Sequence, residues 1–250
     1  MLNFFNKTVV ILLFMAAPVC ADQASDLTAS LDHETGAHIE TLLENSASPH
    51  PWTSVARVLS HEQIFMLYQQ REFQPIWIDG GQLKPEVEIL MESLRNAGAH
   101  GLCGDDYRLA ELEELLRIQS DFARHNLPLA PDNRAVLDLS LSQAFLTYAT
   151  QMVEGQVDPS LAHVDWKARR RKADLVKLLE YAIENHRLPQ VLEDLVPPHE
   201  EYRQLVAALS HYQQLSAYGG WPQIPVGPTL RPGDEDERLL WRHMENLMCR

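Results

Sequence analysis

The fold is decided by the stretch that runs from Pro131 to Glu154, PDNRAVLDLSLSQAFLTYATQMVE. Pro131-Asp132 opens the longest helical pattern in the chain, and Gly155 ends it. Between these points, apolar residues recur at helical spacing and form one wide stripe: Leu137, Leu141, Ala144, Phe145, Tyr148 and Met152. A stripe this wide predicts a central helix that is buried by its neighbours.

Shorter amphipathic segments lie on both sides of this stretch. Their apolar residues recur at intervals of three and four, which is typical of helices that bury one face. Between the first two segments, Gln74 to Gly81 breaks the periodicity and predicts an extended turn. No segment shows a sustained alternation of apolar and polar residues, so the sequence does not predict a sheet. We therefore expect an all-α fold, an irregular multi-helix globular domain. The predicted flanking helices cover residues 60–73, 85–97, 107–122, 173–186, 188–196 and 201–218.

The N-terminus has the three-part pattern of a secretory signal peptide. Lys7 supplies a positive charge, residues 8–19 are almost wholly apolar, and small residues precede Asp22. Because a bilayer span needs about 20 apolar residues, we expect cleavage after Ala21 and export to the periplasm. The alternative is an uncleaved signal that anchors the protein in the inner membrane. No later segment has the composition of a span, so no stable membrane span is expected after cleavage.

The net charge bears on the possible partners, and the cysteine content bears on disulfides. The formal net charge is −14, and Lys7 is the one charge in the signal, so the mature chain is more acidic still. A chain this acidic is a poor ligand for nucleic acid through bulk charge. Beyond the signal only Cys103 and Cys249 remain. Two distant thiols do not form a disulfide framework, and we expect none.

The segment from Gly219 to Gly233 is rich in proline and glycine and predicts a linker. Before the helical domain, the polar stretch from Asp22 to Ser48 supports at most a short helix around Ile39 to Leu43. After the linker, one short helix is expected. The predicted parts are a signal peptide at 1–21, a partly helical segment at 22–58, the helical domain at 59–220, the linker at 221–233 and the final helix at 234–250.

The chain contains five short motifs in succession: Tyr68 to Trp77; His100-Gly101-Leu102 with Asp105-Asp106-Tyr107; Gly155 to Pro159 with Trp166; Pro198 to Tyr202 with Gly219 to Pro222; and Leu230 to Asp234 with Arg238-Leu239. In this order they resemble the helical scaffold domain of the large bacterial L,D-transpeptidases, followed by the truncated start of a peptidoglycan-binding module. The resemblance covers residues 60–245.

The resemblance implies where the chemistry of the family resides. In the full enzymes a later β-rich domain carries a nucleophilic cysteine in a Ser/Thr-His-Gly-Cys string, with a separate histidine as base. This sequence contains no His-Gly-Cys string. We therefore expect no catalytic residue, no cofactor and no metal site. Scattered histidines without a His-Glu-x-x-His string agree with the last point.

The predicted function is that of a non-catalytic periplasmic scaffold or cell-wall-associated protein. Its expected partner is peptidoglycan or a cell-wall-synthesis protein. One alternative is a truncated or split fragment of an L,D-transpeptidase with no independent function. A second is a thiol enzyme that uses Cys103 as nucleophile beside His100. Gly98, Gly101 and Gly104 instead favour a turn at this position.

Three tryptophans and one apolar cluster are candidate contact residues. Trp77, Trp166 and Trp221 each lie beside Pro, Asp or Gly in a predicted loop. Such rings stack on sugars or pin a loop to the core, and we favour pinning. Near the C-terminus, four apolar residues are expected either to pack on the scaffold or to stay exposed: Leu239, Leu240, Met244 and Leu247.

Overall fold

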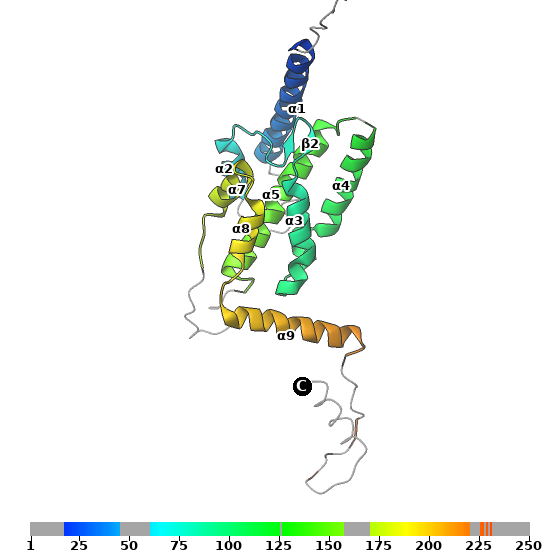
Figure 1. Cartoon of the computed structure of the whole chain (residues 1–250), viewed down its shortest axis with the longest axis vertical. Coiled ribbons are helices and arrows are strands. Elements are labelled where there is room, and N and C mark those ends of the chain that lie inside the picture. The colour runs from blue at the N-terminus through cyan, green and yellow to red at the C-terminus, as the bar shows by residue number, and fades with distance from the viewer. Residues whose placement is uncertain are drawn as a thin grey trace, which may run out of the picture.

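The protein is an all-α bundle, as the sequence predicts, and Figure 1 shows its arrangement. The computed structural model describes residues 18–45, 61–125, 127–157, 171–220, 226–227, 229 and 231. In this part of the chain the α-helices are α1 (Pro18–Glu44), α2 (His61–Gln70), α3 (Glu86–Arg95), α4 (Leu109–Arg124), α5 (Pro131–Glu154), α7 (Leu175–Glu184), α8 (Leu188–Leu195) and α9 (Glu200–Ala217). Two short 3-10 helices, η2 (Asn96–His100) and η3 (Gly104–Tyr107), link α3 to α4.

Helix α5 forms the centre of the bundle. Helices α1, α3, α4, α7 and α8 all contact it. Figure 1 shows α3 and α4 on one side of α5 and α7 on the other, and α8 contacts both α3 and α7. Sixteen residues of α5 are buried, and they include the polar side chains of Arg134, Asp138, Ser142, Thr147 and Gln151. The prediction of a central buried helix from the stripe in residues 131–154 is therefore confirmed.

Helix α1 differs from the prediction. Instead of a short helix around Ile39 to Leu43, one continuous helix of 27 residues packs against α5. Its buried side includes Thr35 and Gly36 as well as Ile39 and Leu43. A Cβ atom at Gly36 would lie 3.0 Å from the carbonyl oxygen of Phe73, so this helix approaches the backbone closely. The prediction was wrong because it relied on the spacing of apolar residues, and Thr35 and Gly36, which are not strongly apolar, form part of the buried side.

A buried arginine of α5 holds α1 in place. The Arg134 side chain is 1% exposed. Its Nε donates to Thr35 Oγ1 at 2.9 Å, and its Nη2 donates to the carbonyl oxygen of Leu31 at 3.1 Å. Burial lowers the pKa of Arg134, and the nearby Glu34 carboxylate opposes this shift. Since buried guanidinium groups are stable only when paired, the position of α1 depends on these contacts.

The predicted extended turn contains a minimal hairpin. Strands β1 (Ile78–Asp79) and β2 (Gln82–Leu83) pair antiparallel across Gly80 and Gly81, which both have positive φ. Two consecutive residues of positive φ suit a tight hairpin turn and favour glycine. The turn is held from two sides. Gly80 N donates to Asp32 of α1 at 3.0 Å, and Gln119 of α4 donates to the Gly81 carbonyl at 3.1 Å.

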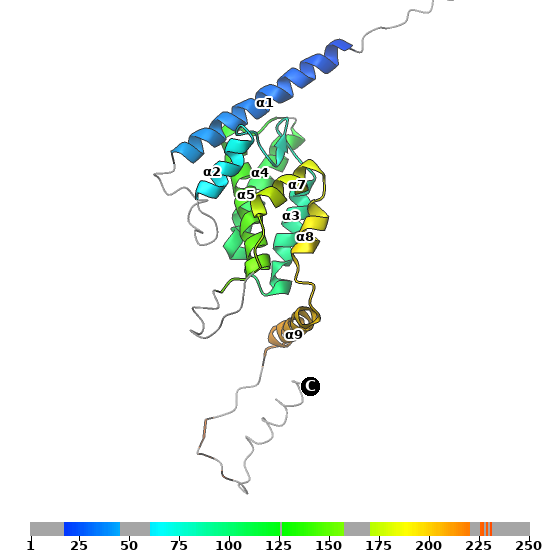
Figure 2. The ribbon, with the colours of Figure 1, turned by 90° about the vertical axis from the view of Figure 1, so that its left-hand side faces the viewer.

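Helix α9 lies across one end of the bundle, as the two views agree (Figures 1 and 2). It contacts η2. None of its 18 residues is fully buried. Among the described helices it is therefore the one that the rest of the protein covers least, and it lies beside the turn that contains His100.

Several predictions fall on residues outside the described part of the chain. These are the signal peptide up to Ala17, Trp166, the linker residue Trp221, and the final helix at 234–250 with Cys249. The predicted cleavage point after Ala21 lies within the first turns of α1. None of the described helices is long and apolar enough to cross a membrane.

Candidate functional site

A buried carboxylate on α5 fixes the segment that carries the first of the five motifs. Asp138 is fully buried. Its two oxygens accept the backbone N–H groups of Ile76 at 2.9 Å and Trp77 at 2.8 Å. The Tyr68 hydroxyl donates to the same carboxylate at 2.7 Å. These partners are 61–70 residues away in sequence, so Asp138 joins the end of α2 and the following loop to the central helix.

Trp77, a candidate for sugar stacking or loop pinning, lies beside this carboxylate. Its side chain is fully buried, and the indole N–H donates to Ser142 Oγ at 2.9 Å. Its ring is 6.4 Å from that of Phe145, centroid to centroid. A ring without an exposed face has no surface to offer a sugar. In this arrangement Trp77 attaches the loop before β1 to α5.

The titration behaviour of this network fits a structural role. Burial raises the pKa of Asp138, while the N–H groups of Ile76 and Trp77 and the Tyr68 hydroxyl lower it. Burial also raises the pKa of Tyr68 well above its usual range, so the hydroxyl keeps its proton and can donate it. A general acid or base must reach its substrate. Neither group has that access, and the network therefore serves packing.

The second motif forms a polar junction between η3 and the end of α5. The Tyr107 hydroxyl donates to Gln151 Oε1, and Gln151 Nε2 donates to Asp106 Oδ2 at 2.8 Å. Gln156 also donates to Asp106, at 3.2 Å. Burial raises the pKa of Tyr107. The acidic residue and the tyrosine of the Asp-Tyr motif thus hold the connection between α3 and α4 on α5.

The proposed thiol centre, Cys103 with His100, lies in that same connection. Gly101 ends η2 with a φ of 76°, and Cys103 precedes η3 in an extended conformation with its side chain exposed. The string is therefore a turn between helical segments, as its glycines predict. His100 Nδ1 lies 2.7 Å from the Tyr202 hydroxyl of α9, and the two rings stack with centroids 6.0 Å apart.

The Tyr202 hydroxyl is therefore the hydrogen-bond partner of His100 Nδ1. Burial lowers the pKa of His100, which favours the neutral ring. A nucleophilic cysteine needs a base within hydrogen-bonding distance and donors for an oxyanion. No hydrogen bond between Cys103 and His100 is found in the described residues. The histidine instead joins α9 to the bundle.

Two grooves meet at His100. The larger has a cavity volume of about 480 Å³ and lies between η2, the end of α5 and the start of α9. Its walls include Gln151, Glu154, Arg171 and Tyr202. The second, of about 330 Å³, lies between α3 and α8. Volumes of this size are in the range of small-ligand and peptide pockets.

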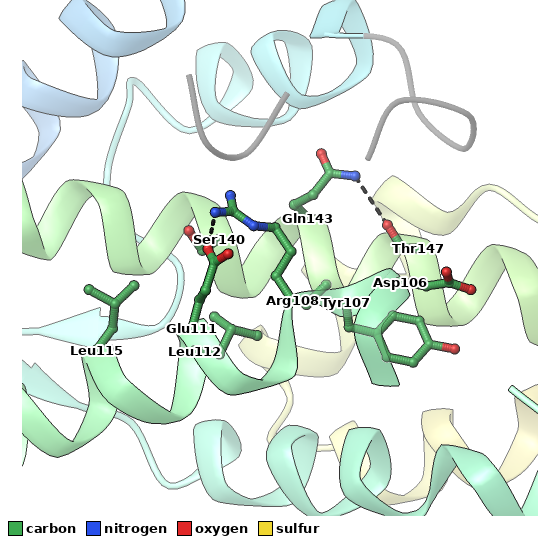
Figure 3. A pocket seen from close by; sticks show the side chains of 10 residues that line it. Asp106, Tyr107, Arg108, Glu111, Leu112, Leu115, Ser140, Gln143 and Thr147 are labelled. Atoms are coloured by element: carbon green, nitrogen blue, oxygen red, sulfur yellow. Dashed lines mark hydrogen bonds and ion pairs between the residues drawn. The ribbon is translucent and has the colours of Figure 1, made fainter. Parts of the chain in front are cut away.

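A smaller cavity lies between η3, α4 and α5, where Arg108 extends across polar side chains of α5 (Figure 3). Its volume is about 30 Å³, which accommodates about one water molecule. Arg108 pairs with Glu111, and Gln143 donates to Thr147 at 3.1 Å. This cavity is too small for a substrate and is part of the packing.

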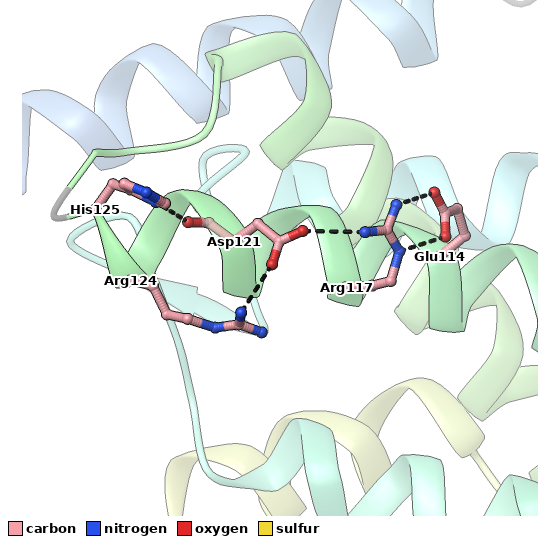
Figure 4. Close-up of polar contacts among 5 residues, drawn as sticks. All are labelled: Glu114, Arg117, Asp121, Arg124 and His125. Atoms are coloured by element: carbon pink, nitrogen blue, oxygen red, sulfur yellow. Dashed lines mark hydrogen bonds and ion pairs between the residues drawn. The ribbon is translucent and has the colours of Figure 1, made fainter.

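The outer surface of α4 carries a row of ion pairs (Figure 4). Arg117 bonds both Glu114 and Asp121, and Arg124 pairs with Asp121. His125 Nδ1 lies 2.9 Å from the carbonyl oxygen of Asp121. Exposed pairs at this spacing contribute little stability each and keep a helix surface solvated. We assign no ligand to this surface.

The described residues contain no group of three or more His, Cys, Asp or Glu side chains that could hold a metal ion. His33 and His38 of α1 are exposed. Of the basic run at 169–172, Arg171 and Lys172 are described and exposed. Arg171 Nη1 donates to the carbonyl oxygen of Leu195 at 3.2 Å.

Sequence reasoning missed two residues that organise the structure, Arg134 and Asp138. Asp138 carried a usable signal, because a lone carboxylate inside the apolar stripe of a buried helix needs hydrogen-bond donors from elsewhere. Arg134 carried the same signal. Tyr202 belongs to the fourth motif, but its contact with His100 could not be inferred from spacing.

The fold and these contacts define a helical scaffold whose buried polar groups are engaged in holding helices together. A protein-family model described as "Scaffold domain" matches residues 62–209, more than half of the chain. The chain therefore belongs to the Scaffold domain family, and the predicted resemblance to the scaffold domain of L,D-transpeptidases is confirmed. Searches of curated proteins and of solved structures give no match.

Proposed function

We propose that this protein is a non-catalytic, periplasmic scaffold protein that associates with the bacterial cell wall. The observation that carries the proposal is the Scaffold domain match over residues 62–209. The N-terminal sequence pattern supports export. In the described residues, the titratable groups near the turn at His100 and Cys103 hold helices together, which supports a structural role for this domain.

Peptidoglycan is the proposed partner. The larger groove beside His100 has the volume and the mixed polar lining that a short peptide or sugar segment requires. Arg171 is an exposed cation on its wall and suits a carboxylate of a stem peptide. The net charge of −14 disfavours bulk attraction to an acidic polymer. Binding should therefore depend on local contacts.

Co-sedimentation with isolated sacculi tests this function. We expect the purified full-length protein to pellet with sacculi and to keep part of its binding as NaCl is raised, because salt screens bulk attraction and the exposed Arg171–carboxylate contact but not the other contacts within the groove. Arg171→Ala should lower the bound fraction. Arg124→Ala is the matched control, since it removes the same charge from the exposed surface of α4.

Three results would contradict the proposal. One is the absence of retention at any salt concentration, which an inert enzyme fragment or an adaptor unrelated to cell walls would show. Another is retention that disappears at modest salt. A third is an equal loss of binding in Arg171→Ala and Arg124→Ala, since this would exclude the groove as the binding surface.

A further inference from the structure

The groove between α3 and α8 carries a carboxylate on each of its two walls. Its volume is about 330 Å³. Glu92 of α3 and Glu193 of α8 both line it, and both residues are exposed. Within the described part of the chain, neither carboxylate belongs to an ion pair. Two carboxylates that no neighbouring cation compensates favour a cationic ligand at this groove.

A buried tyrosine of α5 adds a polar group to the same groove. Tyr148 lines the groove and is only 3% exposed. Its ring packs edge-on against that of Tyr107, with the centroids 5.9 Å apart. Its hydroxyl has no hydrogen-bond partner among the described residues, yet it is not one of the side-chain atoms that the protein encloses without a partner. The hydroxyl therefore reaches the groove.

This unpaired hydroxyl points to a ligand, because buried polar groups are paired in almost all proteins. Burial raises the pKa of Tyr148, so the hydroxyl keeps its proton at neutral pH. It is then a hydrogen-bond donor, and a carbonyl oxygen of a peptide is a suitable acceptor.

The other walls of the groove suit an aliphatic arm. Ile89, Leu192 and Val196 line it together with the two carboxylates. An amine at the end of such an arm can lay its methylene groups on apolar walls and keep its charge beside the carboxylates, as lysine side chains do on protein surfaces.

This groove adjoins the larger one, since His100 lines both. In the larger groove, Arg171 is attached to the end of α8, because its Nη1 donates to the carbonyl oxygen of Leu195 at 3.2 Å. One groove thus offers a cation and the other offers two carboxylates. This arrangement is complementary to a ligand that carries a carboxylate and an amine at separate positions.

We propose that the groove between α3 and α8 binds a primary amine on an aliphatic side chain of a stem peptide whose carboxylate lies at Arg171. The amine lies between Glu92 and Glu193, and the Tyr148 hydroxyl donates to a carbonyl oxygen of the peptide. The inference rests on the proposed function and adds which chemical groups of peptidoglycan are recognised. Stem peptides whose amine has not been consumed by a cross-link are then the preferred ligands.

Binding of the full-length protein to chemically modified sacculi tests the inference. Treatment of protein-free sacculi with acetic anhydride removes the charge of their free amines. We expect the wild type to bind acetylated sacculi about fivefold more weakly than untreated ones, given the modest strength of exposed charge pairs. Glu92→Gln combined with Glu193→Gln should bind untreated sacculi about fivefold more weakly than the wild type does. This variant should lose little more on acetylation.

Glu40→Gln combined with Glu44→Gln is the matched control, because it removes the same two charges from exposed positions of α1. Acetylation makes the sacculi more negative and repels every acidic protein, so the informative quantity is the difference between the two double variants. The control should lose as much affinity on acetylation as the wild type does. All four glutamates are exposed, and both variants should therefore fold.

Tyr148→Phe tests the tyrosine separately. It should weaken binding to untreated sacculi about threefold, the loss of one hydrogen bond. The free energy of unfolding should not fall, since the hydroxyl has no partner to lose among the described residues.

An equal loss on acetylation in the wild type and in the Glu92 and Glu193 double variant would overturn the inference and leave the proposed function intact. Normal binding by Tyr148→Phe would also overturn it, because the hydroxyl would then lie outside the site. Absence of binding to untreated sacculi would contradict the proposed function as well as the inference.

Discussion

Asp138→Ala is expected to lower the stability of the protein strongly. It removes the acceptor of two buried backbone N–H groups, those of Ile76 and Trp77. Each unpaired buried donor costs about 1–3 kcal/mol. The Tyr68 hydroxyl keeps Ser142 as a partner at 2.7 Å. The variant also escapes the burial cost that raises the pKa of Asp138, which offsets part of the loss.

The expected net loss is about 3 kcal/mol, a large part of the roughly 5–15 kcal/mol that stabilises a typical domain. Equilibrium unfolding in urea, followed by circular dichroism, measures it. Asp138→Asn should lose less, because one side-chain oxygen remains. Asp132→Ala is the matched control: it makes the same change on the same helix at an exposed position. A loss below about 1 kcal/mol for Asp138→Ala, or an equal loss for Asp132→Ala, would refute the assignment of Asp138 as the junction between α2 and α5.

Three further substitutions test other contacts. Arg134→Ala should destabilise the protein by about 2–4 kcal/mol and make α1 the first site of limited proteolysis; unchanged cleavage would contradict its role as anchor. Burial raises the pKa of Glu86, but the hydrogen bond with His186 at 2.6 Å, a backbone hydrogen bond and the charges of His186 and Lys84 together bring the pKa below its ordinary 4.5. The resulting stability is present above pH 4.5 and lost as the pH falls through the folded pKa, so the unfolding free energies of the wild type and Glu86→Gln should converge on acidification; a constant difference would disprove the pairing. Tyr202→Phe keeps the stacked ring but loses about 0.5–1.5 kcal/mol of hydrogen bonding, and faster exchange confined to α9 is expected; no change would show that the bond to His100 does not hold α9.

Helices with a continuous apolar stripe were predictable from local sequence. The pattern from Pro131 to Glu154 gave the bounds of α5 as observed, because its capping residues and its stripe are both local. The connection around Gly101 was predictable for the same reason, since glycine punctuates a helix wherever positive φ is needed.

The parts that could not be predicted depend on contacts between distant residues. Helix α1 is held by Arg134, 99 residues beyond its partner Thr35, and its buried side includes Gly36. The Trp77 contact with Ser142 spans 65 residues. Periodicity describes which side of a helix is apolar, but it does not identify the partner of a buried polar group. The larger groove beside His100 likewise arises only when η2, α5 and α9 meet.

If the protein is a non-catalytic scaffold that binds the cell wall, it must leave the wall chemically unchanged. Muropeptide analysis of sacculi incubated with the full-length protein measures this. The protein should be recovered in the pellet, and the stem peptides should keep both their terminal D-alanine and their degree of cross-linking. Release of D-alanine or new cross-links that disappear in Cys103→Ser would contradict this expectation and would favour a thiol enzyme.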